Sequence, residues 1–74
     1  MPLRRAPFVG ARVTVVFLAR RVPGTIEEVS DGGRRVVVVT EDDEVIRFAL
    51  IPATGNFMEE GKAVGGARLR WEDD

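Results

Sequence analysis

The sequence has 74 residues, of which 45% are hydrophobic and 31% charged, and it carries a net charge of −1. This composition is typical of a folded protein, and the length allows one domain, residues 1–74, with a small core. Cysteine and histidine are absent, which excludes a disulfide framework and a Cys/His zinc site as supports for that core.

Runs of β-branched and aromatic residues, separated by turn-forming residues, indicate short strands along the chain. The expected strands are 12–18, 24–29, 34–40, 45–51, a short one at 57–58 and a last one at 67–71. Turn-forming residues at 30–33, the acidic tetrad 41–44 and the sequence Thr-Gly-Asn at 54–56 separate several of these runs. The pattern contains no convincing helix.

Five or six short strands without a helix predict an all-β fold, a small five- or six-stranded antiparallel barrel, because a sheet of this size loses its exposed edges by closing. Alternation along the strands predicts an inward-facing set, namely Val13, Val15, Phe17, Val36, Val38, Ile46, Phe48 and Leu50. Trp71 alternates with Ala67 and Leu69, which favours a position in the core or at the barrel rim. Residues 1–9 and 72–74 are expected to be flexible tails.

Eight positions in the first half of the chain carry a family resemblance. They are Gly10, Val13, Val15, Gly24, Ile26, Val29, Val36 and Val38. This pattern resembles the KOW-type pattern of Src-homology-3-like barrels, in which glycines sit at tight bends and aliphatic side chains fill the barrel. The resemblance implies binding to ribosomal RNA or to the transcription machinery. The loop 19–23 departs from the family, which carries glycine and lysine there.

A fainter similarity is to PilZ domains, which are receptors for cyclic di-GMP. Glu28, Ser30 and Gly33 have the spacing of one PilZ motif, with glutamate where the family has aspartate or asparagine. Arg4 and Arg5 lie upstream, where the family carries two arginines four residues apart. This resemblance implies a cyclic-dinucleotide receptor.

The residue types needed for catalysis are scarce, and we expect no enzymatic activity, cofactor or small-molecule substrate. Cysteine and histidine are missing, and there is one serine, Ser30, in a predicted turn, so a nucleophile with an adjacent base is not expected. Glu27 and Glu28 are neighbours on a predicted strand, so their side chains should point to opposite faces and not act as an acid and base pair.

The acidic tetrad at 41–44 is the one cluster that could hold a hard cation such as calcium. It lacks the alternating spacing of a calcium-binding loop, and a solvated hairpin tip is the favoured interpretation. No metal site is therefore predicted.

The sequence predicts neither a membrane segment nor a signal peptide. The longest uncharged run, 48–58, is far shorter than the roughly 20 apolar residues that span a bilayer. No long apolar stretch follows the basic start of the chain at 1–5. We expect a cytoplasmic protein.

The charges are uneven along the chain, and this keeps nucleic acid open as a partner. Residues 1–40 carry seven arginines and three acidic residues, a net +4, whereas residues 41–74 carry four basic and nine acidic residues, a net −5. Ten of the eleven basic residues are arginine, which suits forked contacts with phosphate or carboxylate. The codon usage of a GC-rich genome explains the arginines as well.

The leading hypothesis from the sequence is a binding module for a protein, in a regulatory or accessory role. Arg20 and Arg21 are predicted in an exposed loop, because Pro23 and Gly24 interrupt the strand pattern after them.

Alternation turns four aliphatic side chains outward, namely Val16, Leu18, Val37 and Val39. If their strands lie side by side, these residues form an apolar patch that a second copy or another protein would cover, and we expect a homodimer or a stable complex. Binding to nucleic acid through the arginines is the alternative.

Overall fold

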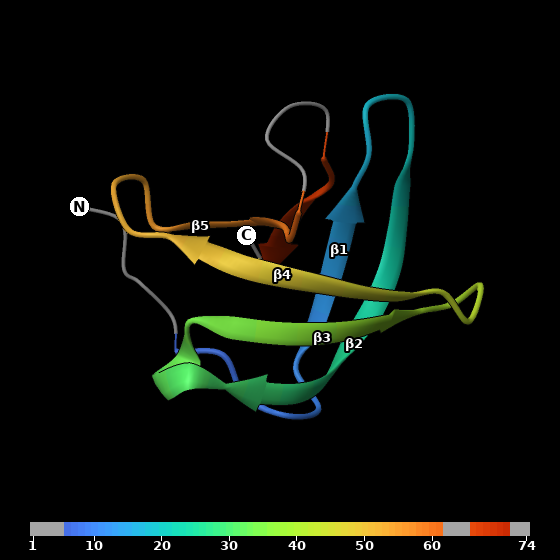
Figure 1. Ribbon diagram of the computed structural model, residues 1–74. Coiled ribbons are helices and arrows are strands. Elements are labelled where there is room, and N and C mark those ends of the chain that lie inside the picture. Colours follow the sequence, from blue (N-terminus) through green and yellow to red (C-terminus); the bar gives the residue numbers. More distant parts are fainter. Residues whose placement is uncertain (1–5, 62–65, 72–74) are drawn as a thin grey trace.

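The β-branched runs of the sequence form six strands, which close into one antiparallel barrel in a computed structural model that describes residues 6–61 and 66–71 (Figure 1). The strands are β1 Arg12–Val16, β2 Arg21–Ser30, β3 Arg35–Thr40, β4 Val45–Ile51, β5 Asn56–Glu59 and β6 Arg68–Trp71. Each strand pairs with the next along the chain, and β6 returns to pair with β1. The predicted all-β antiparallel barrel is confirmed.

One short 3-10 turn, η1 (Asp31–Gly33), connects β2 to β3. Within the described ranges, no helix has the length and apolar character needed to cross a bilayer.

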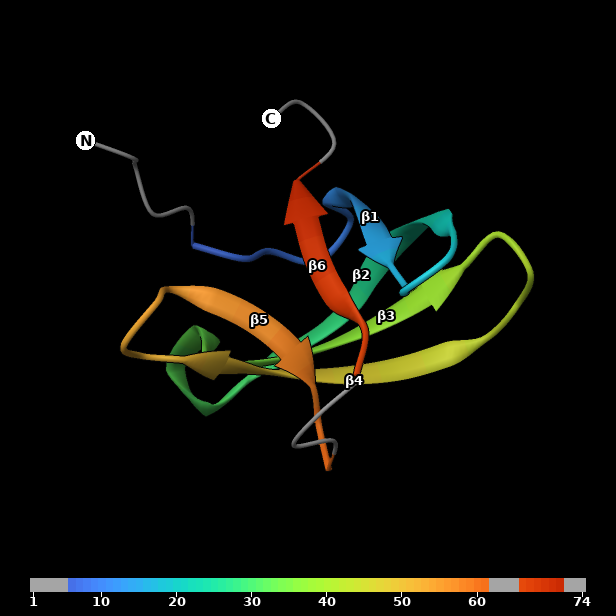
Figure 2. The same ribbon diagram turned by 90° about the horizontal axis from the view of Figure 1, so that it is seen from above.

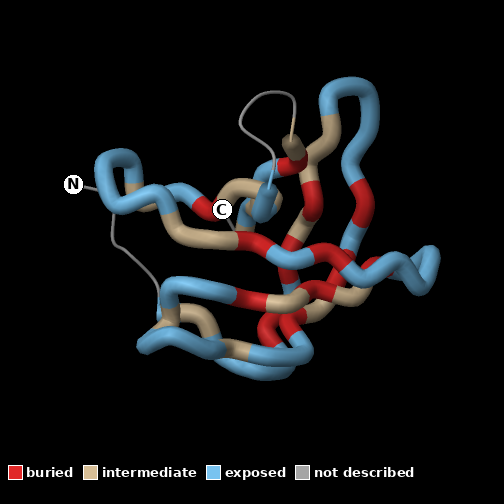
Figure 3. The backbone as a smooth tube through the Cα atoms, viewed as in Figure 1, coloured by how far each residue is buried: buried red, intermediate tan, exposed pale blue. Residues whose placement is uncertain are grey.

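The core fills the barrel with the inward-facing side chains of alternating strand positions. Its buried residues are Ala11, Val13, Val15, Ile26, Val36, Val38, Ile46, Phe48, Phe57 and Ala67, and the half-buried Phe17, Val29, Leu50, Leu69 and Trp71 pack against them. Every residue predicted to face inward lies in one of these two groups, and Trp71 packs against the core as predicted. Figure 3 shows the resulting alternation of buried and half-buried positions along β3.

Strand β2 begins three residues earlier than the sequence pattern indicates, and Arg21 is therefore its first residue. Phe17 donates its N–H to the carbonyl of Arg20, so alternation along the hairpin gives Val22 and Gly24 the backbone bonds to β1. Pro23 lies between these positions, where the strand pairing requires no N–H bond to β1, so its lack of an N–H is tolerated. The expectation that Pro23 interrupts the strand was wrong for this reason.

A β-bulge in the middle of β2 bends this strand around the barrel. The pairing with β3 shifts between Ile26 and Glu28, which leaves Glu27 without an opposite residue. Glu27 and Glu28 are both exposed, so the expectation that they point to opposite faces was wrong. The shift keeps Val29 directed to the core.

Gly24 is the position where β2 comes closest to its neighbours. It pairs with Val13 of β1 and with Thr40 of β3. A Cβ atom at this position would lie 2.8 Å from Cγ1 of Val38 and 3.0 Å from the carbonyl oxygen of Val39. Both distances are below van der Waals contact, so the packing of β2 on β3 requires a residue without a side chain.

Gly24→Ala is therefore expected to destabilise the fold. The added methyl group must displace Val38 or the backbone of β3, at a cost of about 1–3 kcal/mol, which lowers the melting temperature by roughly 4 °C or more. Thermal unfolding followed by circular dichroism measures the effect. Glu27→Ala, on the exposed bulge, is the control and should melt close to the wild type; an unchanged melting temperature for Gly24→Ala would contradict the close approach.

Candidate partner-binding groove

An open groove of about 810 Å³ lies between the β1–β2 loop and the adjoining parts of β5 and β6. Its lining residues are Val16, Phe17, Leu18, Ala19, Arg20, Arg21, Met58, Gly66 and Arg68. Five of these side chains are apolar and three are arginines, and none of the described lining residues is acidic. We call this surface the loop groove. It contains four of the six residues predicted to bind a partner, namely Val16, Leu18, Arg20 and Arg21.

The register of the barrel brings the residues of the loop groove together from four strands. Val16 of β1 pairs with Arg21 of β2 on one side and with Arg68 of β6 on the other. Arg68 in turn pairs with Met58 of β5. Directly opposite side chains on adjacent strands lie about 5 Å apart, so these four residues form one row on the outer surface. In this row two arginines flank an aliphatic side chain.

A second, smaller groove of about 320 Å³ continues the loop groove along β6. It shares Val16, Arg21 and Arg68 with the loop groove and adds Asn56, Leu69 and Arg70. The pairing of β5 with β6 is confined to Met58 and Arg68, and the two strands diverge beyond this point (Figure 2). Arg70 lies opposite Thr14 of β1, one row away from Val16, which extends the basic surface.

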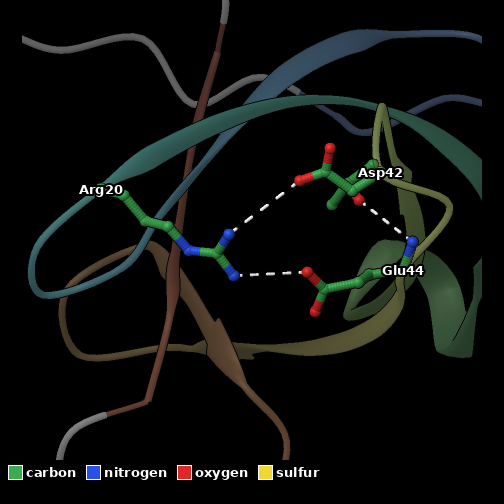
Figure 4. A network of polar contacts seen from close by, with 4 residues as sticks. Arg20, Asp42 and Glu44 are labelled. Carbon is green, nitrogen blue, oxygen red and sulfur yellow. Dashed lines mark hydrogen bonds and ion pairs between the residues drawn. The ribbon is translucent and has the colours of Figure 1, made fainter.

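Arg20 is tied to the acidic tetrad within the molecule (Figure 4). Its Nη2 atom lies 3.3 Å from Oε1 of Glu44, and its Nη1 atom lies 3.9 Å from Oδ2 of Asp42. Its guanidinium carbon lies 4.5 Å from the centre of the Phe17 ring, a cation–π distance. Arg21 and Arg68, by contrast, form no ion pair with any other described side chain. The positive charges of Arg21 and Arg68 are therefore not balanced by a described side chain at the loop groove.

The acidic tetrad forms the exposed turn between β3 and β4, as the sequence predicts. The turn is built on Thr40, whose side chain and backbone make three hydrogen bonds. The hydroxyl accepts from the N–H of Glu44, the carbonyl accepts from the N–H of Asp43, and the N–H donates to the carbonyl of Glu44. Among the described residues, no three His, Cys, Asp or Glu side chains are grouped so as to hold a metal ion.

Val37 and Val39, the other two predicted partner-binding residues, lie on β3, outside the loop groove. Strand β2 separates β1 from β3, so the two strands do not lie side by side, and the condition for one patch of the four outward aliphatic residues is not met. Leu18 follows the end of β1 and is 102% exposed at the rim of the loop groove. The outward aliphatic residues therefore belong to two separate surfaces.

The positions that resemble PilZ domains lie away from the loop groove. Glu28 and Ser30 are exposed at the end of β2, and Gly33 closes η1 with a φ of 91°. η1 and the β1–β2 loop lie at opposite ends of the molecule in both ribbon views (Figures 1 and 2). Arg4 and Arg5 lie outside the described residues.

Comparison with protein-family models, with curated proteins and with solved structures finds no match, so none of the families that the sequence resembles is identified. The aliphatic residues of the KOW-type pattern do fill the barrel. Gly10 occupies a bend with a φ of 94° and donates its N–H to the carbonyl of Ile26. These features describe a small β-barrel and do not distinguish among such families.

Sequence reasoning did not find Met58 and Arg68 as parts of the groove. Alternation places Arg68 on the outer face of its strand, but strand pairing is needed to set it beside Val16. Met58 belongs to a strand of four residues, and no motif or spacing connects it to the β1–β2 loop.

Arg20→Gln is expected to have a small effect on stability. The three side chains of the ion-pair network are about half exposed, at 54% for Arg20, 61% for Asp42 and 47% for Glu44, and exposed pairs of this kind contribute about 0–1 kcal/mol. Chemical denaturation should show a loss below about 1 kcal/mol, most of which disappears near about 1 M salt.

Arg34→Gln is the matched control, because Arg34 is exposed and forms no ion pair with another described side chain. A loss of several kcal/mol for Arg20→Gln, or a loss that salt does not reduce, would show that packing rather than charge holds the β1–β2 loop.

Proposed function

We propose that this chain is a non-enzymatic β-barrel module that binds a protein segment carrying both apolar and acidic side chains, in a regulatory or accessory role. The observation that carries the proposal is the lining of the loop groove. Aliphatic and thioether side chains alternate there with arginines, and the described lining residues include no acidic side chain to neutralise them.

The apolar side chains of the loop groove supply contact area for such a segment. Leu18 is fully exposed at the rim, and covering a leucine side chain contributes about 1.5–3 kcal/mol. Val16 and Met58 are half-buried lining residues, at either side of Arg68 in the cross-strand row. A partner segment with aliphatic or aromatic residues gains by covering these side chains.

The arginines supply the selectivity for carboxylates. Arg21 and Arg68 flank Val16, and each can form a forked, charge-assisted pair with Asp or Glu of the partner. Arg20 is engaged with Asp42 and Glu44, and its role in the proposal is to hold the β1–β2 loop in position. Arg70 extends the basic surface along the second groove.

Nucleic acid is the second candidate, because Arg21, Arg68 and Arg70 all line the second groove and could contact successive phosphates. Binding of single strands also relies on aromatic side chains on which bases stack. Phe17 is the one aromatic residue among the described lining residues of the two grooves, and the guanidinium of Arg20 stacks on one face of its ring. This arrangement favours a protein segment.

The test is a titration with three fluorescent probes: a short peptide that alternates glutamate and leucine, its counterpart with glutamine in place of glutamate, and a single-stranded oligonucleotide. The acidic peptide should bind most tightly. Arg21→Glu and Arg68→Glu should each weaken it about tenfold, which corresponds to about 1.4 kcal/mol, and Leu18→Ser should weaken both peptides. Fluorescence anisotropy gives the dissociation constants.

Arg34→Glu makes the same charge change near η1, away from the groove, and should leave peptide binding unchanged. Tighter binding of the oligonucleotide than of the acidic peptide, with a steep loss in salt, would replace the protein proposal by the nucleic-acid one. Equal dissociation constants for the glutamate peptide and its glutamine counterpart would show that the arginines do not select carboxylates.

A further inference from the structure

The outer face of β2, β3 and β4 carries an apolar surface that the loop groove does not include. Val37 and Val39 point outward from β3, alternating with buried Val36 and Val38. Val39 pairs with Thr25 of β2 on one side and with Val45 of β4 on the other. Val45 is 63% exposed. We call Thr25, Val37, Val39 and Val45 the valine face.

Two opposite charges flank the valine face in a single cross-strand row. Val37 pairs with Glu28 of β2 and with Arg47 of β4. Strands in a sheet lie about 4.8 Å apart, so Glu28 and Arg47 are separated by about 10 Å across β3. Both side chains are exposed, and neither forms an ion pair with any other described side chain. The row therefore presents an acid at one side of Val37 and a base at the other.

The charges of Glu28 and Arg47 complement those of a second copy of the chain when the two copies are related by a two-fold axis of one particular direction. A two-fold axis that runs along β3, in the plane between two copies, sets Val37 and Val39 against the same residues of the second copy. It also exchanges the two sides of the row, so Glu28 of each copy faces Arg47 of the other. An axis at right angles to β3 in that plane, through the row of Val37, would instead oppose Glu28 to Glu28, which like-charge repulsion disfavours.

We infer that the valine face is a homodimer interface and that its occupant is a second copy of this chain, related by the axis along β3. The apolar centre and the charged flanks are those of a self-complementary interface. A dimer also covers Val45, which is 63% exposed, together with the half-buried Val37 and Val39. The inference does not depend on the loop groove, whose lining residues share none of these positions.

A charge exchange tests the interface and its symmetry together. Wild-type protein should have the mass of a dimer in light scattering. Glu28→Arg and Arg47→Glu should each be monomeric when pure, because each sets like charges against one another, and the dissociation constant should rise at least about tenfold. An equimolar mixture of the two variants should restore the dimer, since every facing pair in the mixed dimer is again one Arg and one Glu.

Circular dichroism melts of each variant verify folding. If a charge variant fails to fold, Val37→Thr keeps the β-branched shape and should still weaken the dimer by making its centre polar. Arg68→Glu, in the loop groove, is the control and should remain dimeric. Monomeric wild-type protein at every soluble concentration would overturn the interface. Folded single variants whose mixture stays monomeric would overturn the proposed symmetry.

Discussion

The bend of β2 is the constraint on which the rest of the structure depends, because this one strand serves both halves of the barrel. Its first part, Arg21 to Thr25, pairs with β1, and its later part, Gly24 to Ser30, pairs with β3. At Gly24 the chain must pass within contact distance of β3, and at Glu27 a bulge turns it further. Both features lie in the part of β2 that passes from β1 to β3.

Closure also decides which outward residues share a surface. Because β6 closes the barrel on β1, Val16 lies beside Arg68, and because β4 pairs with β3, Val37 lies beside Arg47. The uneven charge along the sequence is not kept in space. Arg20, from the basic half of the chain, lies against the acidic tetrad, while Arg68, from the acidic half, extends the basic surface beside Arg21.

Local alternation was enough to predict the all-β barrel and most of its core, because side chains alternate between two faces of a strand whatever the order of the strands. The buried Ala11 and Phe57 were not predicted. Alternation could not predict the surfaces, which depend on pairing and register. Alternation places Arg47 on the outside, but the pairing with β3 is what sets it beside Val37. Alternation fails at Glu27 and Glu28, because a bulge inserts one residue that the apolar pattern does not signal.

The two proposed surfaces lie on different sides of the barrel, and their combination has a consequence for binding. The row of the loop groove runs over β5, β6, β1 and the start of β2, whereas the valine face lies over β2, β3 and β4. A dimer formed through the valine face would therefore leave both loop grooves uncovered. A partner with two acidic segments could then occupy both grooves of one dimer, and the second contact would be intramolecular, which raises the overall affinity without any new contact. Disrupting the dimer would weaken such a partner while leaving the affinity of a single segment unchanged.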